Sequence, residues 1–154
     1  MQQHPRILGL DVGDRRIGIA ISDAFAHTAQ PLLTLNRSNR RNDLRMLERL
    51  IRKHEIAEIV IGHPLHMSGD LSPQAAKTAA FAELLRSEFA LPIHLIDERL
   101  TTTEAHRHLD TAEYGARRKA VIDQVAAVLI LQSFLDARAN SQPAEGTIGP
   151  STRS

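Results

Sequence analysis

The sequence predicts a single α/β domain built on a mixed, five-stranded sheet with helices on both faces. One observation is an apolar hairpin that opens the chain, and another is a later alternation of short apolar runs with segments of helical periodicity. Strands separated by helices imply parallel neighbours, whereas the hairpin adds antiparallel ones. The third observation is length, because 154 residues with 42% hydrophobic residues suffice for one well-buried domain and not for two ordinary ones.

Composition excludes several classes of function. The chain has no cysteine, so disulfides, thiolate metal sites and cysteine nucleophiles are excluded. Aromatic residues make up 3% of the chain, which disfavours a platform on which bases stack. The 19 Lys and Arg residues nearly balance the 18 Asp and Glu residues, so net charge argues neither for nor against nucleic acid. The start of the chain lacks an apolar signal region and no run approaches transmembrane length, so we expect a cytoplasmic protein.

The first two strands are predicted within residues 6–23, around a turn at Gly13 and Asp14. The apolar residues that mark these strands are Ile7, Leu8, Leu10, Ile17, Ile19 and Ile21. Asp11 is the anomaly, because a carboxylate inside an apolar strand is costly to bury without a cation or strong donors. The alternative is that Asp11 is a turn residue that accepts hydrogen bonds from nearby backbone amides.

The middle of the chain alternates strands with helices. Pro31–Leu35 is predicted to be an edge strand because it opens with proline, and residues 36–42 are predicted to form a basic loop. The remaining predicted elements are an amphipathic helix from about Asp43, a covered strand over Glu58–Gly62, a long loop over Gly62–Asp70, a helix capped by Ser72 that runs through Phe89, and a strand over Pro92–Ile96.

The last third is predicted to be helical between two irregular segments. Thr101 and Glu104 form a capping box, which predicts a helix to about Leu109. A charge run over Ala112–Lys119 has no periodicity and is predicted to be a mobile loop. An apolar helix is expected over Ala120–Ala139. The predicted domain therefore spans residues 1–139, and residues 140–154 are expected to form a disordered tail rich in Ser, Pro, Gly and Thr.

Three carboxylates are predicted to meet at one end of the sheet. Asp11 ends the first strand, Glu98 follows the last strand, and Asp123 lies near the start of the last helix, where small residues allow a close approach. Ligands collect at the carboxyl ends of parallel strands in such sheets. Converging carboxylates repel one another unless a cation neutralises them, and oxygen ligands suit Mg²⁺ or Mn²⁺. Taken singly, Glu98 could instead be a surface partner of Arg99, and Asp123 an acid favoured near a helix N-terminus.

Four segments in order resemble the motifs of the YqgF family. They are LDVGDRRIGIAISD at residues 10–23, IGHPLHMSG at 61–69, DERLTT at 97–102 and IDQVAAVLILQ at 122–132. Members of this bacterial family have a ribonuclease-H-like fold and are regarded as nucleases that mature the 5′ end of pre-16S rRNA; they are also described as Holliday junction resolvases. The resemblance implies that Asp11, Glu98 and Asp123 are catalytic residues and ligands of a Mg²⁺ or Mn²⁺ ion.

Substrate contacts are predicted around these acids. His63 and His66 stand where the family pattern has Leu and Asn, so they bear on substrate preference, although His63 could simply fill space beside Pro64. The cationic candidates for phosphate binding are Arg15, Arg16, Arg99, Arg117, Arg118 and Lys119, with a further basic group at Arg37, Arg40 and Arg41. Such runs are usually solvated surface, but beside a phosphodiesterase site they would guide a polyanion.

The resemblance implies that the partner is nucleic acid, either pre-rRNA in the small-subunit precursor or branched DNA. Metal-dependent hydrolysis of phosphodiester bonds in pre-16S rRNA is the predicted activity. The alternatives are a junction-cleaving DNA endonuclease and a non-catalytic RNA-binding assembly factor. A phosphotransferase of the actin and sugar-kinase type is disfavoured, because those folds bind nucleotide between two domains and 154 residues supply one.

Overall fold

The computed structural model describes residues 4–64, 72–98 and 116–141. The strands are β1 (Arg6–Val12), β2 (Arg16–Ser22), β3 (Ala29–Asn36), β4 (Ile56–His63) and β5 (Ile93–Asp97), and the helices are α1 (Arg40–His54), α2 (Pro73–Glu88) and α4 (Ala116–Ser141). The helix predicted between Thr101 and Leu109 and the tail beyond Ser141 lie outside the described residues. The single domain over residues 1–139 stays a prediction.

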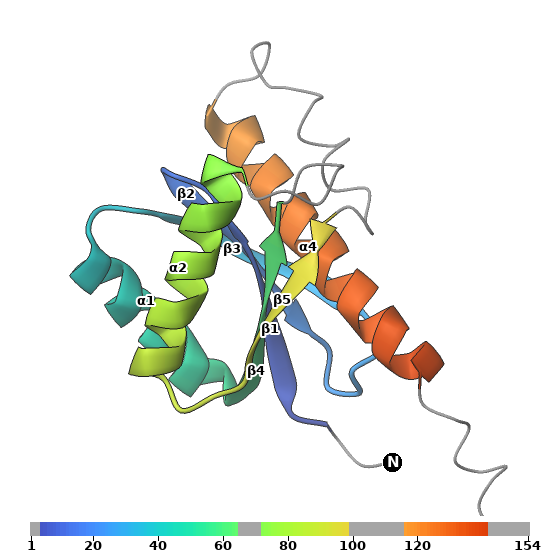
Figure 1. The fold of residues 1–154 in the computed structure, drawn as a ribbon. Coiled ribbons are helices and arrows are strands. Elements are labelled where there is room, and N and C mark those ends of the chain that lie inside the picture. The colour runs from blue at the N-terminus through green and yellow to red at the C-terminus, as the bar shows by residue number, and fades with distance from the viewer. Residues whose placement is uncertain (1–3, 65–71, 99–115, 142–154) are drawn as a thin grey trace, which may run out of the picture.

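The five strands form one mixed sheet in the order β3-β2-β1-β4-β5 (Figure 1). β1 pairs antiparallel with β2, and β2 antiparallel with β3, so the predicted hairpin and the predicted edge position of the third strand are confirmed. β1 pairs parallel with β4, and β4 parallel with β5. The carboxyl ends of β1, β4 and β5 therefore meet at one end of the sheet.

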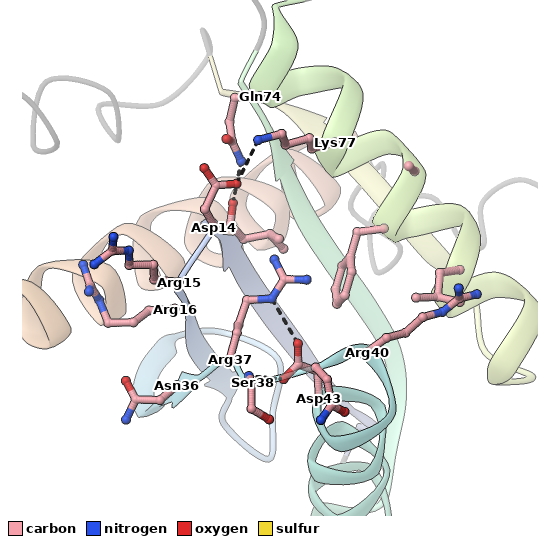
Figure 2. A pocket seen from close by; sticks show the side chains of 15 residues that line it. Asp14, Arg15, Arg16, Asn36, Arg37, Ser38, Arg40, Asp43, Gln74 and Lys77 are labelled. Atoms are coloured by element: carbon pink, nitrogen blue, oxygen red, sulfur yellow. Dashed lines mark hydrogen bonds and ion pairs between the residues drawn. The ribbon is translucent and has the colours of Figure 1, made fainter.

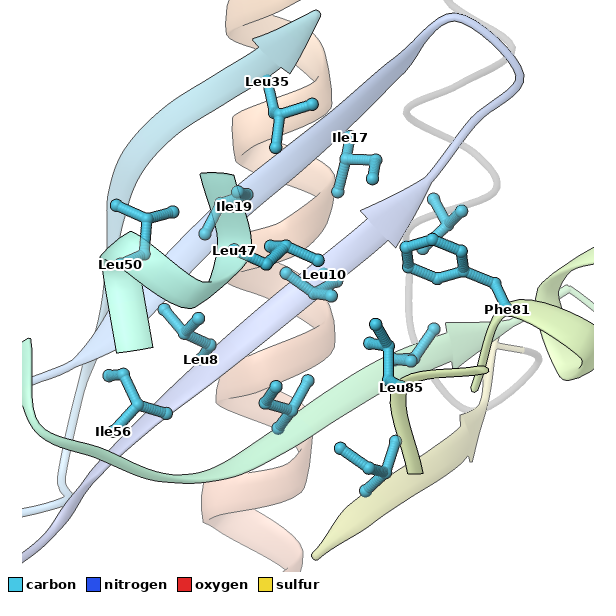
Figure 3. Close-up of a cluster of buried hydrophobic side chains, with 14 of the residues drawn as sticks. Leu8, Leu10, Ile17, Ile19, Leu35, Leu47, Leu50, Ile56, Phe81 and Leu85 are labelled. Carbon is cyan, nitrogen blue, oxygen red and sulfur yellow. The ribbon is translucent and has the colours of Figure 1, made fainter. Parts of the chain in front are cut away.

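Helices cover both faces of the sheet, as predicted. One face packs against α1 and α2, where Leu8, Leu10, Ile17 and Ile19 are fully buried (Figure 3). On the other face, α4 crosses the strands (Figure 1) and buries Ala127, Ile130, Leu131 and Leu135 against Ile7, Ala20 and Val60. Because side chains alternate along a strand, each position of β1 and β2 is assigned to one of these two faces.

Three predicted helix boundaries are wrong. α1 begins at Arg40 and not near Asp43, because Asn39 is an N-cap whose side chain accepts a hydrogen bond from the Asn42 backbone N–H. α4 begins at Ala116, so the end of the charge run predicted to be a loop is its first turn. α4 also includes Asn140 and Ser141, which the prediction placed in the tail. The Ser72 cap of α2 is confirmed, since its side chain accepts from the Ala75 N–H.

Helix α4 also bears on the expectation that no segment reaches transmembrane length. Residues 118–141 are long and apolar enough to cross a membrane by length and composition, so that expectation is wrong for this segment. Charged side chains open the helix and polar ones end it, which hides its length from a scan for apolar runs. In this fold, α4 packs one face on the sheet, which accounts for the apolar residues of that face, whereas Val121 and Val125 are exposed.

The end of α4 is tied to the sheet by a charged cluster. Arg138 donates to both carboxylate oxygens of Glu58 in β4, at 3.0 and 2.9 Å, and His94 of β5 lies 2.9 Å from the same carboxylate. The bonds from Arg138 hold the pKa of Glu58 below its usual value. A carboxylate with a depressed folded-state pKa stabilises the fold above its unfolded pKa and loses that contribution as the pH falls.

We expect Glu58→Gln to lower the free energy of unfolding at neutral pH by about 1 kcal/mol. This value already includes a reduction for solvent screening, because the Arg138 side chain is 40% exposed. Urea titrations should show this difference shrinking as the pH falls below the usual Glu value of 4.5. Glu48→Gln is the control, because the pair that Glu48 makes with Arg52 on α1 is exposed, and this substitution should change stability by about 0.5 kcal/mol or less. If the two proteins differ as much in free energy of unfolding at low pH as at neutral pH, the cluster does not stabilise the fold through the charge of Glu58.

Candidate active site

The centre of the candidate site is a row of three residues across the sheet, formed by Gly18 of β2, Asp11 of β1 and Gly62 of β4. Asp11 pairs with Gly18, and Gly62 lies one residue beyond the Leu10–Ile61 pair. Adjacent strands are about 4.8 Å apart, so the two glycines flank Asp11 closely. Asp11 is 6% exposed and alternates with Leu10, so its side chain lies on the α4 face. The row thus presents one carboxylate between two positions without side chains.

Glu98 lies over Gly62. It follows β5 directly and is 3% exposed. A Cβ atom built at Gly62 would lie 2.5 Å from Glu98 Oε2, so the space that the glycine leaves is filled by this carboxylate. Asp11 and Glu98 are therefore two buried acids on neighbouring positions of one face, at the sheet end where the prediction placed them.

Asp123 lies at the other end of the row, over Gly18 of β2. A Cβ atom at Gly18 would lie 2.0 Å from the backbone oxygen of Asp123, so α4 makes its close approach to the sheet at this residue. The carboxylate of Asp123 accepts a hydrogen bond from Arg16 Nε at 2.7 Å, and both side chains are about a quarter exposed. Asp123 is the acid of the three with access to solvent.

The donor set fits a hard divalent cation, but Asp123 does not lie close enough to share one ion with the other two acids. All three acids offer oxygen ligands, and the missing side chains at Gly18 and Gly62 leave the Asp11 carboxylate accessible to its neighbours. Within the described ranges, however, no group of three His, Cys, Asp or Glu side chains is close enough to hold one ion. The Asp123 carboxylate is held by Arg16 instead, so that pair would have to open for all three acids to share a cation.

Three of the predicted phosphate-binding residues gather beside Asp123. Arg15, Arg16 and Lys119 line a pocket of about 340 Å³ together with Asp123 and the turn between β1 and β2. Arg15 comes from that turn, Arg16 from the start of β2 and Lys119 from the start of α4. This pocket brings cations from the two ends of the chain to the edge of the candidate site, where a phosphate group would meet them.

The other predicted contacts are less closely connected with the acids. His63 alternates with Gly62 in β4, which assigns it to the face covered by α1 and α2, and its Nε2 atom is buried without a hydrogen-bond partner among the described residues. Arg118 is exposed on the first turns of α4. His66 and Arg99 lie outside the described residues, as does the side chain of Arg117, so their roles stay predictions.

A larger pocket lies on the other side of the β1–β2 turn, between α1 and α2 (Figure 2). Its volume is about 930 Å³, and its cationic lining residues are Arg15, Arg16, Arg37, Arg40 and Lys77. Sequence reasoning singled out the four arginines but missed Lys77. No local signal identifies it, because Lys77 is an ordinary exposed position of α2 until α1 and the turn are placed beside it.

Comparison with known proteins identifies the family. The family described as "RuvX: Holliday junction resolvase" matches residues 5–137. The chain belongs to this family. A relative from Thermoanaerobacter pseudethanolicus is 48% identical over 137 residues, covering 88% of this chain and 99% of its own, and one from Moorella thermoacetica is 50% identical over 132 residues, covering 85% and 94%. Both are named "Putative pre-16S rRNA nuclease".

Solved structures confirm the predicted fold. The chain superposes on Thermus thermophilus RuvC in complex with a Holliday junction substrate with a TM-score of 0.54 and 15% identity, covering 90% of this chain and 98% of RuvC. At this identity the likeness shows the ribonuclease-H-like fold alone. Because the chain belongs to the RuvX family, it is a nuclease that hydrolyses phosphodiester bonds. The family resemblance predicted from the four sequence motifs is therefore confirmed.

Proposed function

We propose that the chain is a divalent-metal-dependent nuclease that hydrolyses phosphodiester bonds of pre-16S rRNA during small-subunit maturation in the cytoplasm. The observation that carries the proposal is the placement of Asp11 and Glu98, both buried, on one face at the end of the sheet, with Asp123 above the adjacent strand. The names of relatives that share about half of its residues support the RNA substrate.

Asp11 and Glu98 would hold a Mg²⁺ or Mn²⁺ ion, with Asp123 as the third ligand once it leaves Arg16. Such an ion, when bound, activates a water molecule and stabilises the charge on the phosphate oxygens. Arg15, Arg16 and Lys119 would bind the phosphate next to the cleaved bond, since they line the pocket at Asp123. The hydrolysis joins the water oxygen to phosphorus and breaks one P–O ester bond.

Four-way DNA junctions are the second candidate substrate. The family description names a Holliday junction resolvase, and the same acids would hydrolyse either nucleic acid. The arginines of the turn contact phosphates, which RNA and DNA share, so they do not choose between the two.

The test is cleavage of labelled precursor rRNA and of labelled four-way junctions in parallel, with Mg²⁺, with Mn²⁺ and with excess chelator. We expect the precursor to be shortened at its 5′ side with either ion, to stay intact in chelator, and to be cleaved faster than the junction. Faster cleavage of the junction would favour the second candidate. Binding of the precursor without cleavage of either substrate would indicate a non-catalytic assembly factor, and undiminished cleavage in chelator would contradict the role of the metal.

A further inference from the structure

The pocket between α1 and α2 is built from groups that attract anions. Its lining contains five cationic side chains and two acidic ones, Asp14 and Asp43. Both acids are already paired, Asp14 with Lys77 at 3.3 Å and Asp43 with Arg37 at 3.1 Å. Arg15 and Arg40 make no ion pair with any residue in the described parts of the chain. The lining therefore has positive charge that the protein itself does not neutralise.

Arg37 gives the pocket a fixed centre. Its guanidinium donates to the Gly13 carbonyl oxygen at 2.7 Å and to Asp43, and it lies 5.1 Å from the centroid of the Phe81 ring. In Figure 2 it lies between Asp14 of the turn and Arg40 of α1. A guanidinium has more N–H groups than these two bonds use, so Arg37 keeps donors for a further acceptor.

The first turn of α1 adds to this attraction. Ser38, Asn39 and Arg40 line the pocket at the N-terminus of a 15-residue helix. Unpaired backbone N–H groups and the helix dipole favour anions at such an end. Here the helix N-terminus opens into a cavity that is already lined by cations.

The pocket adjoins the candidate active site across the β1–β2 turn. Asp14, Arg15 and Arg16 line both this pocket and the smaller one at Asp123, because the β1–β2 turn forms the wall between them. Pockets for small molecules have volumes of about 300–1,000 Å³. The larger pocket, at about 930 Å³, therefore has room for a single-stranded segment of one or two nucleotides and not for a duplex.

We propose that this pocket is a second subsite of the nuclease, which binds the sugar–phosphate backbone of the substrate strand after the strand has passed from the catalytic acids over the β1–β2 turn. The proposal rests on the proposed function for the identity of the ligand. It assigns a role to Arg40 and Lys77, which line this pocket and not the one at Asp123. The Lys77–Asp14 pair is 63% exposed on both sides, so it is weak and would open for a phosphate. The substrate class is a single strand, since the pocket has room for one or two nucleotides, whose bases or sugars can lie against the apolar side of α2 at Ala80, Phe81 and Leu84 while their phosphates meet the cations.

The test compares two double variants that remove equal charge. Arg40→Ala with Lys77→Ala removes two cations of the pocket, whereas Arg49→Ala with Lys53→Ala removes two exposed cations of α1 that line neither pocket. Binding of labelled oligouridylates of about four and about twelve nucleotides is measured by fluorescence anisotropy in excess chelator, across a range of salt concentrations.

We expect the wild-type protein to bind the longer strand more tightly than the shorter one. The pocket variant should lose most of this advantage, and the slope of its log affinity for the longer strand against log salt should fall by about 1.4, or about 0.7 for each lost phosphate contact. The control variant should keep both the advantage and the slope.

Three results would overturn the proposal. The first is an equal loss of affinity for the two lengths, and the second is an equal loss in the control variant, which would indicate a diffuse effect of charge. The third is binding of uridine monophosphate that depends on Arg40 and Lys77 as strongly as the longer strand does, which would make the pocket a mononucleotide site. Because binding is measured without turnover, absence of cleavage would contradict the proposed function and leave this result unaffected.

Discussion

Replacing Gly18 with alanine should push α4 away from the sheet and cause a large loss of stability. The added Cβ atom would lie 2.0 Å from the backbone oxygen of Asp123 and 2.4 Å from its carbonyl carbon. Neither atom can move by a change of rotamer, so strand or helix backbone must shift. We expect a loss of about 3 kcal/mol or more, at the upper end of the range for overpacking, and a fall in melting temperature of about 6 to 12 °C.

Gly62→Ala is the matched control, since it adds the same methyl group in the same row. Its Cβ atom would meet the side-chain ends of Glu98 and Ile130, which can rotate away, so the melting temperature should fall less. Gly62→Ala should nevertheless reduce cleavage, because Glu98 has to move. If Gly18→Ala melts at the wild-type temperature, α4 does not approach the sheet at Asp123 as the structure has it.

Much of the fold could be predicted because its signals are local. The alternation of Ile17, Ile19 and Ile21 with small residues identifies a strand covered on both faces, and the proline at residue 31 identifies the edge. Alternation along β1 likewise puts Asp11 on the face opposite Leu8 and Leu10. The helices between β1, β4 and β5 predict that these strands are parallel, and parallel strands bring their carboxyl ends to the same end of the sheet.

The wrong boundaries come from polar residues at helix ends. The segment around Asn39 is polar and basic, and it looks like a loop until Asn39 is recognised as a cap. The charges before Ala120 have no apolar periodicity, yet they continue α4 because a first turn needs no buried face. Apolar periodicity detects the part of a helix that packs, and it misses ends that extend into solvent.

The contacts that define the site depend on tertiary structure. Arg16 and Asp123 are 107 residues apart in sequence, and nothing in either segment predicts that they pair. The position of Gly18 opposite Asp11 depends on the register set by the turn, which composition alone does not fix. The pocket at Lys77 appears only when α1, α2 and the turn are brought together. The family motifs predict the three acids, whereas their surroundings come from the fold.

Asp11→Asn should reduce cleavage by about 10³-fold or more, the scale seen when a residue essential to the chemistry is removed. Asn has nearly the same shape and keeps one oxygen, but it lacks the charge that would bind a divalent ion between Gly18 and Gly62. Because the shape of the side chain is kept, the variant should fold like the wild type, with an unchanged circular dichroism spectrum.

The metal response provides a readout that does not depend on activity. Mg²⁺ or Mn²⁺ at tenfold excess over its dissociation constant should stabilise the wild-type protein by about 1.4 kcal/mol, or about 3 to 6 °C in melting temperature. Asp11→Asn should respond much less. Asp136→Asn, which changes an exposed acid of α4 that accepts a hydrogen bond from Gln132 one turn away, should keep both cleavage and metal response. If Asp11→Asn cleaves and responds to metal like the wild type, the reacting phosphate lies elsewhere and Asp11 is a structural residue of the strand.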